Sequence, residues 1–311
     1  MRVFVAGASG AIGTRLVSQL VDRGHDVVGT HRSPGNAERL RSVGARPVQL
    51  DLLDREAVRR AVLEAEPDAI VHEATALSDI SDFKHFDRTF AQTNRLRTEG
   101  TDALVAAARE AGVRRLVAQS FASGRYERTG GLIKTEDDPL DPNPLPAMRE
   151  SDAAMRHLDK AVVDAGGIVL RYGLFYGAPN DGLIEPIRKR LFPIVGDGGG
   201  MSSFIHLDDA AAATVLAVEQ HDGPGIFNVV DDEPAPARVW LPVLAQVLGA
   251  KPPRRVPRWL ARLFAGEPAV MLGTESRGAS NAKAKRELGW TLRHASWREG
   301  FEATYRALAY V

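Results

Sequence analysis

The segment Arg2–Gly13, with the sequence RVFVAGASGAIG, constrains the fold more than any other part of the chain. Val3–Val5 is a short apolar run of the kind found in a buried parallel strand. Glycines follow at intervals of three residues, and then Ile12, Leu16 and Leu20 recur at helical spacing. A strand, a glycine turn and a helix in this order is the context that a dinucleotide-binding fingerprint requires.

Each glycine of this segment has a separate predicted role. Gly7 permits the tight turn, Gly10 lets the backbone approach a pyrophosphate, and Gly13 lets the helix pack on the strand. The start of the helix offers unpaired N–H groups and a positive dipole end to phosphates. The predicted phosphate-binding loop therefore also includes Ser9, Ala11 and Ile12.

Strand-like and helix-like segments alternate through the first half of the chain. This alternation predicts an α/β fold, a Rossmann-type doubly wound parallel sheet. We expect a dinucleotide-binding domain over residues 1–171 and, over 172–311, mostly a smaller C-terminal substrate-binding lobe, with some chain crossing back to the sheet. The predicted strands are Asp26–Thr30, Pro47–Leu50, Ala69–His72, Leu116–Gln119 and Ile168–Arg171. Helices are predicted over Arg55–Glu64, over Thr98–Ala111 and around Trp240–Leu248.

Composition excludes several classes of function. The 311 residues include 40 basic and 40 acidic side chains, so charge gives no case for binding nucleic acid or an anionic membrane. The absence of cysteine excludes disulfides, thiolate metal sites and a cysteine nucleophile, and no metal site is predicted. The first strand begins at residue 2, which leaves no room for a signal peptide, and we expect a cytoplasmic protein.

Several motifs along the chain carry a resemblance to a known family. They are GASGAIG, Asp51–Leu52, VHEATA at Val71–Ala76, Asn94, AGVRRLVAQS at Ala111–Ser120, LRYGLFYG at Leu170–Gly177, GDGGGMSSFIHLDDAA at Gly196–Ala211 and KAKRELGW at Lys283–Trp290. In this order and spacing the chain resembles the extended short-chain dehydrogenase/reductase family, also called the NAD(P)-dependent epimerase/dehydratase family. The resemblance runs nearly from end to end.

The resemblance implies cofactor contacts beyond the glycine loop. Asp51 and Leu52 would hold the adenine ring, and residues 74–76 would lie along the cofactor ribose. The full set implied for the remaining cofactor surface is Asp51, Leu52, Ala74, Thr75, Ala76, Asn94, Ser120, Tyr172, Gly173 and Leu174. Some members form homodimers, and the sequence leaves the oligomeric state of this chain open.

The end of the second predicted strand indicates which nicotinamide cofactor binds. NAD enzymes usually place an acid there, but this segment reads Gly29-Thr30-His31-Arg32-Ser33. An arginine can bind the 2′-phosphate of NADP through a forked, charge-assisted contact, which a carboxylate would repel. His31 and Arg32 are therefore predicted to contact the cofactor, with NADP favoured and NAD as the alternative.

The residues that carry proton chemistry in this family depart from its pattern here. The resemblance implies a tyrosine and a lysine four residues later, yet none of the five tyrosines has a lysine at that position. In one register Met148 and Asp152 replace the pair, and in the other Ser151 and Met155 do. Phe121 also follows Ser120 where a serine or threonine is expected.

Three residues near the end of the fifth strand are the candidate catalytic residues: Ser120, Ser123 and Tyr126. Tyr126 or a bound water would supply a proton to a substrate held by a serine. Lys134 and His206 are weaker candidates, and Arg277 is a candidate anion contact.

These observations predict an NADP-dependent oxidoreductase that reduces a carbonyl or related group on a small-molecule substrate. The stretch Gly198–Ser203 holds no cation, which disfavours a nucleotide-sugar substrate. Two alternatives stay open: a non-catalytic, cofactor-binding regulator, and a non-redox lyase or isomerase built on the same scaffold.

Overall fold

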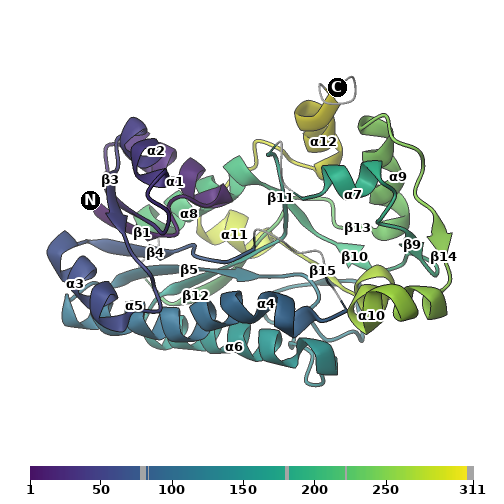
Figure 1. Ribbon diagram of the computed structural model, residues 1–311, viewed down its shortest axis with the longest axis horizontal. Helices are drawn as coiled ribbons and strands as arrows, with labels where there is room; N and C mark the ends of the chain where they lie inside the picture. The colour runs from purple at the N-terminus through teal and green to yellow at the C-terminus, as the bar shows by residue number, and fades with distance from the viewer. Residues whose placement is uncertain (78–81, 83, 179–181, 221–222, 307–311) are drawn as a thin grey trace.

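A seven-stranded parallel sheet forms the centre of the molecule (Figure 1). The computed structural model describes residues 1–77, 82, 84–178, 182–220 and 223–306. The strand order is β12-β7-β5-β4-β1-β2-β3, so the chain winds outward in both directions from β1 and β4. This confirms the predicted Rossmann-type fold. The strands are β1 (Arg2–Ala6), β2 (Asp26–His31), β3 (Arg46–Gln49), β4 (Ala69–His72), β5 (Arg115–Phe121), β7 (Ile168–Tyr172) and β12 (Gly225–Val229).

Helices cover both faces of this sheet. One face packs against α1 (Ala11–Asp22), α8 (Leu207–Gln220) and α11 (Ala282–Glu287). The other packs against α3 (Arg55–Ala65), α5 (Thr101–Glu110) and α6 (Arg149–Asp164). Apart from the edge strand β3, most residues of the strands are buried, as expected of a parallel sheet covered on both sides.

The helix predicted over Thr98–Ala111 begins earlier than the sequence indicated. Helix α4 (Phe86–Arg95) runs through a π-helical turn at Leu96–Gly100 directly into α5. Polar residues occupy most of α4, which hides its helical period. Helix α2 (Asn36–Ser42) packs beside β2 and β3.

The C-terminal lobe is built from short paired strands and helices. Strand β8 (Leu174–Tyr176) pairs with β11 (Phe204–His206), and Tyr176, Phe204 and Phe301 pack edge to face in its core. Its other elements are β9 (Ile194–Val195), β10 (Met201–Ser202), β13 (Ala235–Pro236), β14 (Arg255–Val256), α7 (Ile184–Arg188), α9 (Ala237–Val247), α10 (Arg258–Thr274) and α12 (Trp297–Tyr305).

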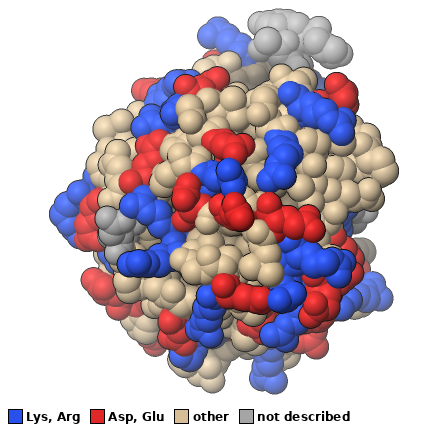
Figure 2. Space-filling model, turned by 90° about the vertical axis from the view of Figure 1, so that its left-hand side faces the viewer, with Lys and Arg blue, Asp and Glu red and all other residues tan. Residues whose placement is uncertain are grey.

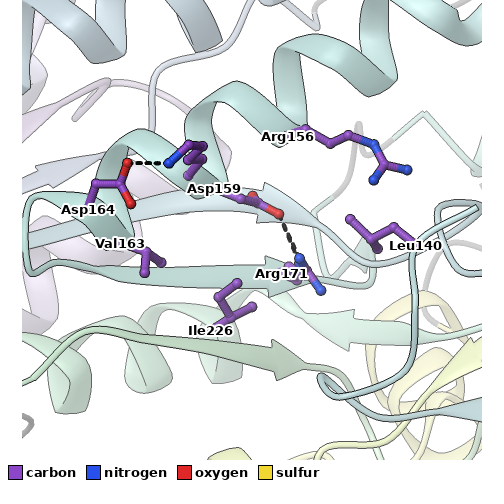
Figure 3. Close-up of a pocket in the computed structure, with 8 residues that line it drawn as sticks. Leu140, Arg156, Asp159, Val163, Asp164, Arg171 and Ile226 are labelled. Carbon is purple, nitrogen blue, oxygen red and sulfur yellow. Dashed lines mark hydrogen bonds and ion pairs between the residues drawn. The ribbon is translucent and has the colours of Figure 1, made fainter. Parts of the chain in front are cut away.

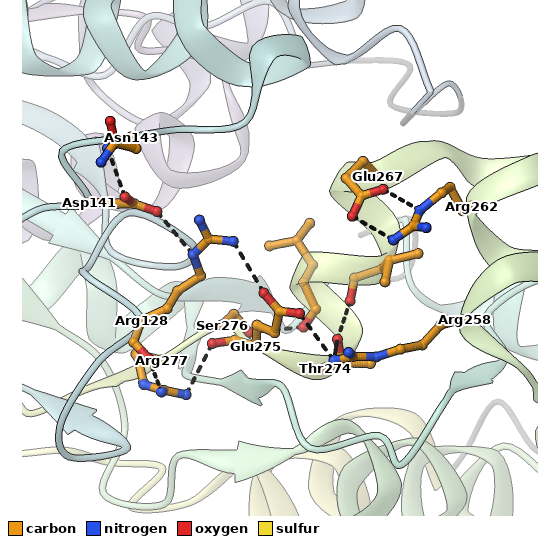
Figure 4. A network of polar contacts seen from close by, with 12 residues as sticks. Arg128, Asp141, Asn143, Arg258, Arg262, Glu267, Thr274, Glu275, Ser276 and Arg277 are labelled. Carbon is orange, nitrogen blue, oxygen red and sulfur yellow. Dashed lines mark hydrogen bonds and ion pairs between the residues drawn. The ribbon is translucent and has the colours of Figure 1, made fainter.

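The lobe and the sheet are joined at several places. Beyond residue 172, α8 packs against the sheet and β12 pairs with β7 within it. Strand β6 (Ile133–Lys134) pairs with β15 (Gly278–Ala279), while η2 (Pro146–Met148) leads into α6. Arg128 pairs with Asp141 at 3.1 Å and with Glu275 at 3.2 Å, which ties the loop after β5 to the end of α10 (Figure 4).

Charge is distributed evenly on the face that carries α3, α5 and the edge of the sheet. Figure 2 shows basic and acidic side chains interspersed there, without a region of one sign. Within the described residues, none of the helices is both long and apolar enough to cross a bilayer.

Candidate functional site

The turn between β1 and α1 has the geometry predicted for a phosphate-binding loop. Gly7 has a φ of +90°, which L side chains rarely adopt, and its N–H donates to Thr30 Oγ1 at 3.0 Å. A Cβ on Gly13 would lie 2.2 Å from the Gly7 oxygen. The loop therefore holds α1 so close to the strand that only glycine fits at residue 13, and the start of α1 points its free N–H groups at the loop.

A cleft opens beside this loop at the carboxyl ends of the strands. Parallel α/β sheets bind their ligands at this edge. Eight predicted cofactor residues line it, namely Gly7, Ser9, Gly10, His31, Arg32, Leu52, Ala74 and Thr75. Sequence reasoning missed Thr30, Ser33, Asn36, Leu50, Glu73 and Leu96, although most of these are neighbours of predicted residues.

Arg32 reaches the cleft from the end of β2 with an exposed side chain. The imidazole Nδ1 of His31 lies 3.0 Å from the Ser33 oxygen, which fixes the turn that presents Arg32. Ser33 and Asn36 add polar side chains from the same side. This corner of the cleft therefore offers a forked cation and hydrogen-bonding groups, and the described segment His31–Asn36 contains no carboxylate.

Several other predicted cofactor residues are not among those that line the cleft and have other contacts. Asp51 caps its own turn by accepting from the Leu53 N–H at 3.0 Å, and the Ala76 N–H donates to Thr93 Oγ1 at 3.1 Å. Gly173 packs against backbone of Ser203, where a Cβ would approach within 2.6 Å. Leu174 continues into β8, while Ala11 and Ile12 begin α1.

Glu73 is buried in the wall of the cleft directly after β4. The Tyr172 hydroxyl donates to its Oε1 at 3.0 Å and also lies 2.6 Å from Thr214 Oγ1. Burial raises the pKa of Glu73 to about 8, and the Tyr172 hydrogen bond only partly opposes this shift. The Tyr172 hydroxyl is therefore already engaged in the buried hydrogen bond to Glu73.

Ser120 belongs to a buried ionic cluster at the end of β5. Its hydroxyl donates to Asp159 Oδ1 at 2.6 Å and accepts from Arg125 Nη1 at 3.0 Å. Asp159 also pairs with Arg125 at 3.1 Å and with Arg171 at 2.8 Å. These two guanidinium groups outweigh the effect of burial and keep the pKa of Asp159 below its usual value. The Ser120 hydroxyl is thus fully occupied.

Tyr126 extends from the loop after β5 into the same buried region. Its hydroxyl donates to Asn228 Oδ1 at 2.7 Å, and only 2% of the residue is exposed. Burial raises the pKa of its hydroxyl further, although Arg171 opposes this. The structure therefore directs this predicted proton donor at β12 and not at the residues that line the cleft.

Ser123 differs from these two candidates. Its hydroxyl is buried and has no hydrogen-bond partner among the described residues. It precedes Gly124, whose Cβ position would lie 2.9 Å from Leu272 Cδ2 of α10. Ser123 thus lies where the loop after β5 meets the C-terminal lobe.

The weaker candidates all have structural partners. Lys134 is buried and pairs with Asp138 at 3.2 Å. The ring of His206 stacks on His294 at 3.7 Å between centroids, and its Nδ1 accepts from the Asp208 N–H. Arg277 donates to the backbone oxygens of Glu275 and Arg128.

The N-terminal part of α6 carries the residues that replace the expected pair. Asp152 is buried and pairs with Arg156 at 2.5 Å, while Ser151 donates to Asp87 Oδ1 at 2.7 Å. Met148 precedes the helix, and Met155 is buried one turn further. In either register these side chains supply no acid in place of a tyrosine, because the one ionisable group among them is already paired.

A second cavity lies where α6 packs over β7 and β12 (Figure 3). It is lined by Leu140, Arg156, Asp159, Lys160, Val163, Asp164, Arg171 and Ile226. Its polar groups are paired with one another, as in Lys160–Asp164 at 2.6 Å. The glycine-rich cleft is therefore the better candidate for a functional site.

The fold and this cleft define a Rossmann-type nicotinamide-dinucleotide-binding protein. Comparison with known families makes the assignment specific, because the sequence model described as "NAD dependent epimerase/dehydratase family" matches residues 3–229. The chain belongs to this family, the extended short-chain dehydrogenases/reductases.

Individual relatives point toward reductive chemistry. The chain is 44% identical over 308 residues to a 3-diazoavenalumate denitrifying reductase of a Streptomyces species, covering 96% of this chain and 99% of the relative. It is 29% identical over 335 residues to a dihydroquinoline-oxide ketoreductase of Stigmatella aurantiaca, covering 99% and 96%. These relatives and the family together support a nicotinamide-dependent enzyme.

Solved structures share the fold over the whole chain. UDP-glucose 4-epimerase of Thermotoga maritima superposes with a TM-score of 0.78 at 20% identity, covering 98% of this chain and 97% of that one. The Thermus thermophilus UDP-glucose 4-epimerase, solved in complex with NAD, gives 0.76 at 24% identity, covering 100% and 99%.

Proposed function

We propose that this protein is an NADPH-dependent reductase that delivers hydride to a small electrophilic substrate without a tyrosine acid. The observation that carries the proposal is the contrast within one site. The cleft is lined by the glycine loop and Arg32, while by resemblance the family's proton-transferring pair is replaced by Met148 and Asp152 in one register or by Ser151 and Met155 in the other.

The NADPH preference follows from the charge at the end of β2. Arg32 is exposed toward the cleft, and none of its guanidinium nitrogens has a partner in the described structure. A 2′-phosphate would accept two charge-assisted hydrogen bonds from it. The ribose hydroxyl of NADH would gain much less, because it carries no charge.

The missing acid restricts the substrate. Reduction of a ketone requires a proton on the developing alkoxide, which enzymes usually supply from a positioned acid. The hydroxyls of Tyr126 and Ser120 already donate hydrogen bonds, to Asn228 and Asp159 respectively. A substrate whose reduction needs no proton therefore fits this site better than a simple ketone.

An aromatic diazo compound meets this requirement, and the 44% identical relative is named for such a substrate. In the net reaction, an arenediazonium ion and NADPH give the arene, dinitrogen and NADP⁺. The hydride forms the new C–H bond with its electron pair, and the C–N pair leaves with dinitrogen. No proton is consumed or released.

The region between the loop after β5 and α10 is the proposed place for the substrate. Ser123 offers its unpartnered hydroxyl there, and Leu272 of α10 approaches the neighbouring Gly124. Phe121 is partly exposed at the same edge and presents an apolar ring. An aromatic substrate with few polar groups suits such a lining.

The test is NADPH oxidation with 4-carboxybenzenediazonium and, separately, with 4-carboxybenzaldehyde. We expect one dinitrogen and one benzoate per NADPH from the first, above a blank without enzyme, and little turnover of the second. Faster turnover of the aldehyde would return the assignment to carbonyl reduction. Tight NADPH binding with no turnover of either would favour the regulator.

A further inference from the structure

The helix from Phe86 to Glu110 has an unusual inner face. Asn94, Arg97 and Thr101 follow one another at spacings of three and four residues, which places them on one side of the helix. All three are at least nine-tenths buried. Asn94 Oδ1 and Thr101 Oγ1 have no hydrogen-bond partner, although Asn94 Nδ2 donates to Ser151 Oγ at 3.0 Å. No hydrogen bond or ion pair within the described residues involves the Arg97 guanidinium, whose nitrogens are not among the fully buried unpartnered atoms.

Arg97 lies inside the π-helical turn Leu96–Gly100. Such single turns cost regular helical geometry and are frequent at functional sites. Leu96, the preceding residue, lines the cofactor cleft, and its carbonyl oxygen lies 3.3 Å from His72 Nε2 at the end of β4. The turn therefore places Arg97 next to the inner end of the cleft.

The charges around Arg97 fix its surroundings. Arg97 acts electrostatically on His72, and Arg125 and Asp159 act on Arg97. These neighbours lie at the ends of β4 and β5 and on α6, the part of the edge that faces the nicotinamide end of a Rossmann cofactor.

Asp159, the one acid among these neighbours, already has ion-pair partners. Asp159 pairs with both Arg125 and Arg171, and Asp152 on the same helix pairs with Arg156. Burial and the like charge of Arg125 lower the pKa of Arg97 to about 10, so it still carries its charge at neutral pH. Arg97 therefore carries a charge that no group contacts directly, and a bound anion would compensate the cost of keeping that charge largely out of water.

We propose that Arg97 binds a carboxylate of the substrate and so positions the aromatic ring at the nicotinamide end of the cleft. This inference rests on the proposed reductase function. A guanidinium can hold a carboxylate through two parallel hydrogen bonds, which fixes the orientation of the ring as well as its position.

The experiment measures binding of two probes to the protein–NADP⁺ complex by calorimetry. The probes are 4-hydroxybenzoate and its neutral amide, 4-hydroxybenzamide. We expect the unmodified protein to bind the benzoate at least about tenfold more tightly, because the charged contact exists only with the carboxylate. Arg97→Met should abolish this preference, and Arg97→Lys should keep part of it.

Arg95→Met is the matched control. Arg95 lies two residues earlier on the same helix, but it is exposed and pairs with Glu99 at 2.7 Å. This variant should keep the full benzoate preference. NADPH affinity should stay within about threefold of the parent in every variant, and thermal unfolding shows which variants are folded. Arg97→Lys keeps the test usable if Arg97→Met does not fold.

Equal binding of the two probes to the parent protein would overturn the proposal. So would an Arg97→Met variant that keeps the preference, which would mean that water alone satisfies the guanidinium. A selective loss of NADPH affinity in Arg97→Met would reassign Arg97 to the cofactor. Failure of the reductase proposal looks different, because the benzoate preference would then persist while no acceptor consumes NADPH.

Discussion

The two ends of the cleft contrast sharply. At the β1–β2 end, backbone geometry determines the site: the positive φ of Gly7, the contact across Gly13 and the open cation of Arg32. Beyond the β4–β5 end, outside the residues that line the cleft, side-chain charges dominate, in the cluster around Asp159 and at Arg97. The predicted cofactor end therefore depends on backbone geometry, while the predicted substrate end depends on side chains from distant parts of the chain.

The largest effect is expected from closing the backbone contact at the first end. Gly13→Ala places a Cβ 2.2 Å from the Gly7 oxygen, which is too close, so the loop must move. NADPH affinity should fall by about 100-fold or more, roughly 3 kcal/mol. Gly35→Ala is the control, because Gly35 has a helical φ of −60° and open space around its Cβ position. Fluorescence titration of NADPH measures both, and equal affinities would contradict the predicted role of Gly13.

Arg32→Asp sharpens the contrast by changing charge without changing backbone. The variant loses a forked phosphate contact and gains a repulsive carboxylate, so NADPH binding should weaken by roughly 2–4 kcal/mol. NADH binding should change little. Arg39→Asp, an exposed change on α2, should leave both affinities unaltered. Equal losses for the two cofactors, or a parent protein that prefers NADH, would reverse the NADP assignment.

A smaller effect is expected from Tyr126→Phe. A tyrosine acid would be worth about 10²–10⁴-fold in turnover. Since its hydroxyl is bound to Asn228, we expect less than about a threefold change in kcat and about 1 kcal/mol loss of stability from the broken hydrogen bond. Turnover of 4-carboxybenzenediazonium and urea unfolding measure the two effects. A hundredfold loss of kcat would restore Tyr126 as the proton donor.

The smallest effect concerns Glu73. Its pKa is raised from 4.5 to about 8 in the folded protein, so folding is favoured most strongly below pH 4.5 and this contribution is lost as the pH rises to 8. Glu73→Gln should remove this dependence, so that its free energy of unfolding relative to the parent rises between pH 5 and pH 8. A constant difference across these pH values would show that Glu73 titrates normally.

Much of the fold could be predicted because local patterns and tertiary structure agree. The strand Ala69–His72 has the predicted bounds, and the strand predicted at Ile168–Arg171 ends one residue later, at Tyr172. β12 was missed as an element because Gly225–Val229 is a five-residue stretch whose pairing with β7 depends on distant chain. The start of α4 was missed because its residues are mostly polar.

The site was predictable only where it depends on backbone. The glycine spacing and the sequence at the end of β2 predicted residues that line the cleft. The partners of Ser120 and Tyr126 come from α6 and β12, far along the chain, so no local pattern could show that these hydroxyls are occupied. Arg97 left no signal, because an arginine in a polar helical segment normally indicates an exposed face.

The central claim, hydride transfer without a protein acid, is tested most directly by isotope effects on single turnovers of 4-carboxybenzenediazonium. With NADPH deuterated at the transferring position, we expect slower hydride transfer, one deuterium on the ring carbon that carried nitrogen, and no slowing in D₂O. A solvent isotope effect of about 2 or more, or ring hydrogen derived from solvent, would show that a proton moves in the reaction and would rule out hydride transfer without an acid.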